Sequence, residues 1–255
     1  MAQRQGTKRG KERPDYIKWM LIAGAVVVTA VLLVLVAKRQ HLFHHNVDID
    51  HRQYPVAGID VSKHNGDIDF EQVRDQGFEF VFIKASEGAT FHDPNFIANH
   101  HAATKAGLKV GAYHFFRKNR EGDAQARNLL RAVAGHRLDL PLVIDVEDWD
   151  NDHFVTDADI KRRLTQLVRT LESKGYRIMI YTNGHGYEKY YKPNFAGKPL
   201  WLCSFTDPQK LQSNYPVTIQ QHSHWGEVKG IDGEVDLNVF CGSREQWNDF
   251  LNNNQ

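Results

Sequence analysis

The sequence predicts an α/β protein whose main part is an irregular (β/α) barrel, preceded by one transmembrane helix. Short apolar runs alternate with amphipathic segments about five times between residues 56 and 182. Three further strand-like runs between residues 199 and 240 leave little room for full helices. Near the N-terminus, a run of about 19 residues without a charge has the length of a bilayer core.

Residues 1–18 are polar and mainly basic, so we expect a cytoplasmic tail without a packed core. Residues 19–37 are predicted to be a transmembrane signal anchor with the lipid bilayer as its partner. A cleaved signal peptide is the competing interpretation, but it would have a shorter apolar core and a small-x-small cleavage site, which this stretch lacks. The basic excess before the span predicts a single-pass protein in the cytoplasmic membrane, with its N-terminus inside. Residues 38–55 then form a polar stem, and residues 56–255 form an extracytoplasmic barrel domain on the periplasmic or cell-wall side.

The overall charge argues against one large class of partners. The chain has 32 basic and 31 acidic residues, and this balance gives no support for nucleic-acid binding. Two cysteines, Cys203 and Cys241, are too few for a disulfide framework, and the sequence leaves open whether they pair or stay as thiols. The histidines lack the spacing of a zinc site, so we expect no metal and no other cofactor.

The first four helices of the barrel are predicted from their ends and their apolar stripes. Glycine directly follows the helices expected at 70–76 and 95–106. Asp123 lies close to an N-cap position at the start of the helix expected at 123–134. The helix expected at 157–174 has a single apolar stripe, formed by Ile160, Leu164, Leu167, Val168 and Leu171.

Apolar runs between these helices predict the strands 56–61, 78–85, 108–116, 140–147 and 176–182. Further strands are expected at 199–205, 216–222 and 235–240, with a hairpin connection at 226–234 and a last helix at 243–251. Right-handed crossovers at successive strand–helix units lead to a parallel sheet that closes. In such barrels the active site lies at the carboxyl ends of the strands.

Two carboxylates end the fourth predicted strand, in the sequence LPLVIDVEDW at 140–149. Asp145 and Glu147 are two residues apart, so in a strand both side chains point the same way, with α-carbons roughly 6.6 Å apart. Acids at the end of an apolar strand are costly to bury and typically line a cleft that perturbs their pKa. Asp60 ends the first strand, and Asp236 in the last strand is a further inward candidate.

Aromatic and polar residues share this predicted edge with the acids. Carboxyl groups mixed with aromatic rings suit oligosaccharide chemistry, because rings cover the apolar faces of sugars and acids act on the glycosidic oxygen. Lys84 and Glu87 pair either with one another or with the acids. The candidate substrate-binding residues are Tyr113, Phe115, Tyr181, Asn183, Lys84 and Glu87.

From Gly58 to Ser243 the sequence resembles glycoside hydrolase family 25, the peptidoglycan muramidases, or lysozymes, of that type. Six stretches match in the expected order: GIDVSKHNG at 58–66, FVFIKASEG at 80–88, KVGAYHFF at 109–116, PLVIDVE at 141–147, IYTN at 180–183 and GIDGEVDLNVF at 230–240.

The resemblance implies an irregular barrel of about five β/α units plus three strands. It also implies hydrolysis of the β-1,4 bond between N-acetylmuramic acid and N-acetylglucosamine in peptidoglycan. Glu147 would be the general acid, and Asp145 would polarise the substrate's N-acetyl group or stabilise charge directly. Asp60 and Asp236 would complete an acidic ring. We favour participation of the N-acetyl group over a covalent aspartyl intermediate.

One strand departs from the family pattern. The seventh strand of the family usually ends in a run like W-Q-Y, whereas this chain has Gln220, Gln221 and His222. Loss of an aromatic pair would weaken stacking at one substrate subsite. This departure is the only support for a competing function, a non-catalytic peptidoglycan-binding module on the same barrel. A third hypothesis is a hydrolase of chitin-like N-acetylglucosamine chains.

Overall fold

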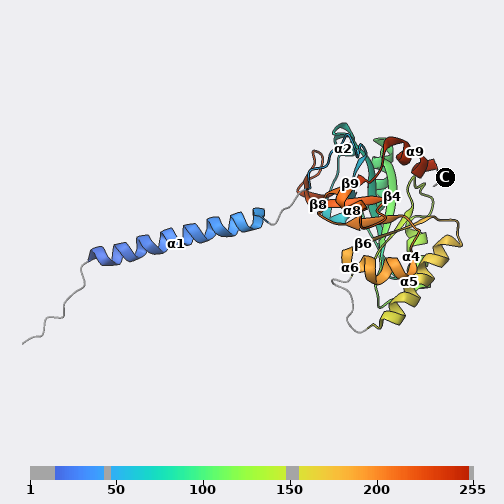
Figure 1. Ribbon diagram of the computed structural model, residues 1–255, viewed down its shortest axis with the longest axis horizontal. Coiled ribbons are helices and arrows are strands. Elements are labelled where there is room, and N and C mark those ends of the chain that lie inside the picture. The colour runs from blue at the N-terminus through green and yellow to red at the C-terminus, as the bar shows by residue number, and fades with distance from the viewer. Residues whose placement is uncertain (1–14, 43–46, 148–154, 253–255) are drawn as a thin grey trace, which may run out of the picture. The chain divides into compact units, whose positions relative to one another are not determined.

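A computed structural model describes residues 15–42, 47–147 and 155–252 of the chain (Figure 1). The chain divides into two compact units, Met1–His45 and Asn46–Gln255. Residues 1–14 of the predicted tail and residues 43–46 of the predicted stem lie outside the described part. In the first unit, the helix α1 (Asp15–Leu42) contains a 21-residue segment, Tyr16–Val36, that is long and apolar enough to cross a membrane. This segment largely coincides with the predicted span.

The second unit contains the predicted barrel. Eight strands close on themselves in the order β1-β9-β8-β7-β6-β5-β4-β2, because β1 also pairs with β2, and a short strand β3 is added to β2. The strands are β1 (Ala57–Val61), β2 (Phe78–Glu87), β3 (Phe91–His92), β4 (Lys109–Phe115), β5 (Leu142–Asp145), β6 (Ile178–Asn183), β7 (Leu200–Cys203), β8 (Ile219–Glu227) and β9 (Glu234–Phe240). The α/β barrel expected from the sequence is therefore confirmed.

Strand direction changes only at the last strand of the barrel. The barrel strands β1, β2, β4, β5, β6, β7 and β8 run parallel to their neighbours in this group, whereas β9 is antiparallel to both β8 and β1. The added strand β3 is antiparallel to β2. A hairpin joins β8 to β9, and a hairpin necessarily reverses the chain. β8 extends to Glu227, so the connection is shorter than the predicted 226–234.

The helices that connect the parallel strands agree with the expected positions. They are α2 (Phe70–Asp75), α3 (Phe96–Lys105), α4 (Gly122–Ala132) and α5 (Asp157–Glu172), and α9 (Arg244–Asn252) ends the domain. Asp123 is not the N-cap of α4, because Glu121 occupies that position. The Asp123 carboxylate instead accepts hydrogen bonds from Gln166 and Thr170 on α5. It thereby ties together α4 and α5, which lie side by side in Figure 1.

Short helical segments were not expected from the sequence. They are η1 (Lys63–Asn65), α6 (Gly184–Gly186), η2 (Tyr187–Tyr191), α7 (Lys192–Asn194) and α8 (Pro208–Gln212). Segments of three to five residues are too short to show a helical apolar period, so pattern reasoning misses them.

Alternate residues along each strand separate the barrel interior from the layer under the helices. On β2, Val81 and Ile83 pack with the helices, whereas Phe80 and Phe82 belong to the interior cluster. The other interior residues include Val143, Met179, Trp201, Ile219 and Phe240. Trp247 on α9 lies 5.3 Å from the Phe80 ring, centroid to centroid, and so helps to fill the floor of the barrel.

Glycines make room for the large rings in this interior. A β-carbon at Gly58 would overlap the Phe80 ring, and one at Gly111 would overlap the Phe82 ring. Phe82 stacks on Trp201 with 4.6 Å between ring centroids. A few aromatic side chains therefore fill the floor, and the residues that face them on β1 and β4 are glycines without a side chain.

Candidate active site

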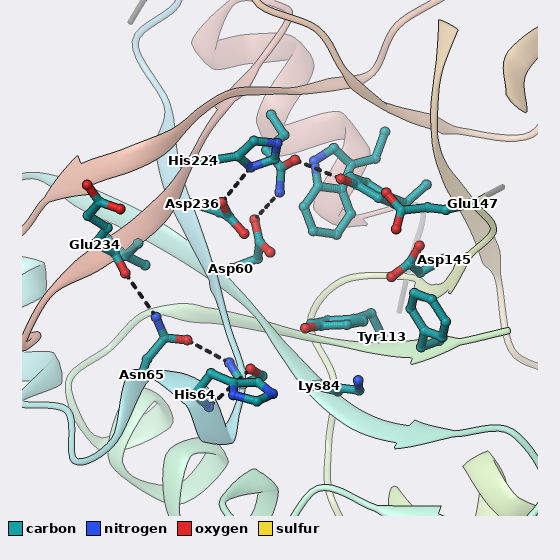
Figure 2. Close-up of a pocket in the computed structure, with 16 residues that line it drawn as sticks. Asp60, His64, Asn65, Lys84, Tyr113, Asp145, Glu147, His224, Glu234 and Asp236 are labelled. Atoms are coloured by element: carbon teal, nitrogen blue, oxygen red, sulfur yellow. Dashed lines mark hydrogen bonds and ion pairs between the residues drawn. The ribbon is translucent and has the colours of Figure 1, made fainter. Parts of the chain in front are cut away.

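A cavity of about 630 Å³ lies at the carboxyl ends of the parallel strands. Figure 2 shows the labelled side chains Asp60, Asp145, Glu147 and Asp236 directed into this shared space. The residues that line it are Asp60, Ser62, His64, Asn65, Lys84, Tyr113, Phe115, Asp145, Glu147, Tyr181, Trp201, Gln221, His224, Glu234, Val235 and Asp236. The cavity thus brings together acids that are far apart in the sequence.

Asp145 and Glu147 are held by the backbone between two neighbouring strands. Asp145 is the last residue of β5, and its carbonyl accepts a hydrogen bond from Phe116 N at 2.9 Å. Val146 is fully buried, donates to Tyr181 O at 3.0 Å and accepts from the Thr182 hydroxyl at 2.8 Å. These bonds fix the chain on both sides of Val146, so both carboxylates are presented to the cavity. β5 ends at Asp145, so Glu147 lies two residues beyond the strand, whereas the sequence predicts a strand that extends to residue 147.

Asp145 is an unusual buried acid. Its side chain is 8% exposed, and Oδ1 is buried without a hydrogen-bond partner. Burial and the neighbouring charge of Glu147 raise the pKa of Asp145 well above its ordinary value, against the opposing effect of Lys84. The charged form of Asp145 is therefore disfavoured in the protein.

Asp60 faces Asp236 across the barrel seam, where β1 and β9 place them directly opposite each other. Asp60 Oδ2 accepts hydrogen bonds from Gln221 Nε2 at 2.9 Å and from Asn238 Nδ2 at 2.7 Å. Burial and the charge of Asp236 nevertheless raise the pKa of Asp60 well above its ordinary value. Asp60 is thus positioned firmly while its charged form is disfavoured.

Each amide that binds Asp60 is itself oriented by an aromatic donor. The Tyr181 hydroxyl donates to Gln221 Oε1 at 2.7 Å, and Trp201 Nε1 donates to Asn238 Oδ1 at 2.8 Å. Both amide side chains are almost fully buried. This network fixes which amide atom faces Asp60, because each oxygen already accepts a hydrogen bond.

Asp236 forms a different kind of contact at the edge of the cavity. Its Oδ1 lies 2.7 Å from His224 Nδ1, and both side chains are more than a third exposed. The hydrogen bond to Asp236, with a smaller effect of Cys203, raises the pKa of His224 to about 10. The acidic cavity therefore carries an imidazolium at one side. Sequence reasoning gave His224 no role in the site.

Aromatic rings and a lysine form the opposite wall. Tyr113 is half-buried, and burial and the charges of Asp60, Asp145 and Asp236 raise its pKa, so the phenol keeps its proton. Lys84 Nζ lies 5.2 Å from the centroid of the Phe115 ring. This wall offers aromatic surface close to the acids.

Two of the predicted substrate contacts do not line the cavity. Glu87 accepts hydrogen bonds from Lys84 Nζ at 2.7 Å and from Arg117 Nη2 at 2.6 Å. Asn183 caps α6, with its side-chain oxygen accepting from Gly186 N. The residues that line the cavity therefore do not support the predicted contacts of Glu87 and Asn183 with substrate. The other predicted residues, namely Asp60, Lys84, Tyr113, Phe115, Asp145, Glu147, Tyr181 and Asp236, all line it.

The strand that departs from the family pattern keeps its inward residue. Gln221 lines the cavity, whereas Gln220 and His222 do not. Gln220 Nε2 instead donates to the carbonyls of Ser204 and Thr206, at 2.6 and 2.7 Å. The two atypical side chains therefore do not contribute to the wall of the cavity.

Within the described residues, no group of three or more His, Cys, Asp or Glu side chains has the geometry of a metal site. Cys203 is half-buried and Cys241 is buried, and both are free thiols, which resolves the pairing left open by the sequence.

An eight-stranded α/β barrel with paired acids and aromatic rings at the carboxyl ends of its strands is the architecture of a barrel glycoside hydrolase. The sequence profile described as "Glycosyl hydrolases family 25" matches residues 59–231. The chain therefore belongs to glycosyl hydrolases family 25, and it is a glycoside hydrolase.

Individual proteins show the same relationship. A family 25 glycosyl hydrolase from Bacillus anthracis has a similar structure, with a TM-score of 0.73 and 33% identity over 82% of this chain and 98% of that one. A bacterial lysozyme from Streptomyces coelicolor has a TM-score of 0.67 and 28% identity, over 78% and 98%. Lysozyme M1 of Streptomyces globisporus is 31% identical over 74% of this chain and 68% of its own length.

Proposed function

We propose that this protein is a peptidoglycan muramidase that hydrolyses the β-1,4 bond between N-acetylmuramic acid and N-acetylglucosamine. The main observation behind this proposal is the convergence of Asp60, Asp145, Glu147 and Asp236 in one cavity of about 630 Å³. Similarity to proteins named as lysozymes supports peptidoglycan as the substrate.

In the proposed reaction Glu147 is the general acid that donates a proton to the glycosidic oxygen. Asp145 polarises the N-acetyl group, whose carbonyl oxygen attacks the anomeric carbon while the glycosidic C–O bond breaks and the leaving sugar keeps the proton from Glu147. The Glu147 carboxylate then takes a proton from a water molecule, which attacks the anomeric carbon and releases the N-acetyl oxygen. The Asp145 carboxyl group lines the same cavity as Glu147, which supports its contact with the N-acetyl group. Asp60 and Asp236 maintain the acidic ring, and Tyr113, Phe115 and Lys84 contact the sugar.

The first experiment uses the full-length chain in detergent micelles with purified peptidoglycan. We expect release of soluble muropeptides with new N-acetylmuramic acid reducing ends, detected by mass spectrometry. Glu147→Gln should abolish the release, because an amide has no proton to donate to the leaving oxygen. Glu227→Gln, at the exposed end of β8, is the matched control and should keep full activity. Equal release by Glu147→Gln and the control would refute the assigned role.

The competing functions are outcomes of the same assay. A peptidoglycan-binding module would bind peptidoglycan without producing reducing ends. Its only support was the atypical strand, whose altered residues Gln220 and His222 do not line the cavity. A chitin-type hydrolase would cleave N-acetylglucosamine oligomers as fast as peptidoglycan or faster, so both substrates should be digested side by side.

We also propose that α1 anchors the enzyme, with residues 1–18 in the cytoplasm and the barrel outside. Length and composition of Tyr16–Val36 support a membrane span, and a cleaved signal sequence is the alternative. Protease added to intact spheroplasts should degrade the barrel but not an N-terminal epitope tag. Alkaline carbonate should leave the protein in the membrane. Release of a soluble, N-terminally shortened barrel would instead identify a signal peptide.

A further inference from the structure

Three side chains on neighbouring strands lie in a row beside the cavity: Cys203 on β7, His224 on β8 and Asp236 on β9. Cys203 Sγ lies 3.6 Å from His224 Nε2, and His224 Nδ1 lies 2.7 Å from Asp236 Oδ1. Figure 2 shows the His224–Asp236 contact at the edge of the acidic site. A thiol, an imidazole and a carboxylate in this order are the components of an activated cysteine nucleophile.

We propose that Cys203, His224 and Asp236 form a nucleophilic thiol centre that reacts with small aliphatic disulfides to give a mixed disulfide at Cys203. Cys203 reacts as a thiolate paired with the imidazolium of His224 at Nε2, and Asp236 stabilises that imidazolium through Nδ1. The thiolate attacks one sulfur of the disulfide, and the disulfide's S–S bond breaks. The departing thiolate takes the proton from His224. Cys203 is thereby oxidised, and the released half of the reagent is reduced to a thiol.

The neighbouring groups indicate which disulfide fits. Cys203 is only half-buried, so a small reagent can reach it. The adjacent cavity is also lined by the acids Glu234 and Asp236, which attract cations and repel anions. Phe205, 39% exposed, contacts the His224 ring with 5.1 Å between centroids and adds an apolar surface. A cationic disulfide such as cystamine should therefore react faster than anionic glutathione disulfide.

Cys241 provides an internal control in the same chain. It is 8% exposed, its thiol donates to Val239 O at 3.9 Å, and burial raises its pKa to about 12. A thiol in that environment is inert toward disulfides. Modification confined to Cys203 therefore also reports that the protein remains folded during the reaction.

The test treats the full-length protein in detergent micelles with cystamine and follows each cysteine by peptide mass spectrometry. We expect Cys203 to be modified and Cys241 to remain free. His224→Gln keeps a polar side chain but removes the imidazolium that stabilises the thiolate, and should slow the modification of Cys203 by about tenfold or more. Asp236→Asn should slow it by a smaller factor, because the imidazole remains. Glutathione disulfide should react more slowly than cystamine at equal concentration.

Different results would overturn the proposal. Equal rates at Cys203 in the native protein and in His224→Gln would show an ordinary surface thiol, provided that Cys241 stays unmodified in both. Lack of modification at Cys203, with complete modification of both cysteines after unfolding in urea, would show that the thiol is inaccessible.

A functional consequence rests on the proposed muramidase activity. The adduct would lie against His224, which lines the cavity, so modified enzyme should lose hydrolysis and regain it with a reducing agent. Cys203→Ala, outside the cavity lining, should hydrolyse peptidoglycan normally and resist cystamine. The mass measurement does not depend on hydrolysis, so an inactive protein would refute the proposed function without affecting the thiol result.

Discussion

The floor and the mouth of the barrel come from the same strands but differ in almost every physical property. On β5, Val143 is fully buried in the floor, and Asp145, two residues later, carries a buried oxygen without a partner. On β6 the corresponding residues are Met179 in the floor and Tyr181 in the mouth. The floor is packed with apolar side chains, whereas the mouth, which is the cavity at the carboxyl ends of the strands, contains several buried acids.

This difference indicates where the molecule gains stability and where it loses some. Rings that fill the space above Gly58 and Gly111 stabilise the floor through burial and dispersion. Acids such as Asp60 and Asp145, with pKa values raised by burial, are less stable in their charged form inside the protein than in water. Substitutions in the two regions should therefore have opposite effects on stability.

The largest effect is expected for the activity of Asp145→Asn. An amide cannot take the negative charge that polarises the substrate, so we expect kcat to fall about a hundredfold or more. Measurement of muropeptide release at saturating peptidoglycan checks this value. An unchanged kcat would remove Asp145 from the proposed mechanism.

The same variant should be more stable than the native protein at neutral pH. Burial, followed by the charge of Glu147, raises the folded-state pKa of Asp145 above the unfolded value of about 4. The favourable contribution of the protonated acid is therefore complete below about pH 4 and is lost as pH rises through the folded pKa. Asn does not titrate. Thermal unfolding should show a higher Tm for the variant at pH 7 and a smaller difference near pH 4.

The floor should respond in the opposite direction. Gly111→Ala places a methyl group against Phe82 and should lower the free energy of unfolding by about 1–3 kcal/mol through overpacking. Gly184→Ala is the matched control, because the nearest atom to its added carbon is Tyr215 Oη at 3.8 Å. Urea unfolding monitored by tryptophan fluorescence measures both. Equal losses in the two variants would indicate a general intolerance of alanine.

A smaller loss is expected where floor and mouth meet. Tyr181→Phe removes the hydroxyl that donates to Gln221 and leaves Gln221 Oε1 without that bond. The free energy of unfolding should fall by about 1 kcal/mol. Activity should fall as well, because Gln221 then holds Asp60 less firmly. If the variant is less stable but fully active, the hydrogen bonds from Tyr181 to Gln221 and from Gln221 to Asp60 contribute to stability and not to catalysis.

The smallest effect is expected for His222→Tyr, which restores an aromatic residue at the atypical strand. His222 does not line the cavity, so kcat/KM should change by no more than about twofold. A gain of tenfold would show that this position affects substrate binding despite its orientation.

Most of the barrel was predictable because each strand–helix unit has a strong local pattern. Five parallel strands with amphipathic connections, such as the apolar stripe of α5, are visible in the sequence alone. The segments at 184–194 and the two-residue β3 were not, because their structure depends on packing against the barrel. Asp123 lies close to the N-cap of α4, as predicted, but its hydrogen bonds with Gln166 and Thr170 were not predictable, because they depend on another helix.

Asp60 and Asp145 were predictable from their positions at strand ends, but the cavity acid Glu234 and the residues that hold Asp60 were not. Gln221 and Asn238 bind Asp60 only because antiparallel pairing brings β8 and β9 beside it. Register shifts on β8 between Gln221, Ser223 and Gly226 let both Gln221 and His224 reach the cavity, although they are three residues apart. Asn238 lies within the matched stretch at 230–240, which is the one signal that would have identified it.

The aromatic side chains of α9 that close the floor of the barrel have a consequence for the catalytic cycle. Trp247 and Phe250 pack on Phe240 at the end of the barrel opposite the acids, so the interior offers no through-passage. Cleaved glycan must leave by the opening through which intact glycan arrives. Product fragments should then compete with uncleaved glycan for this opening. Accumulated product should therefore lower the rate of hydrolysis by competitive inhibition.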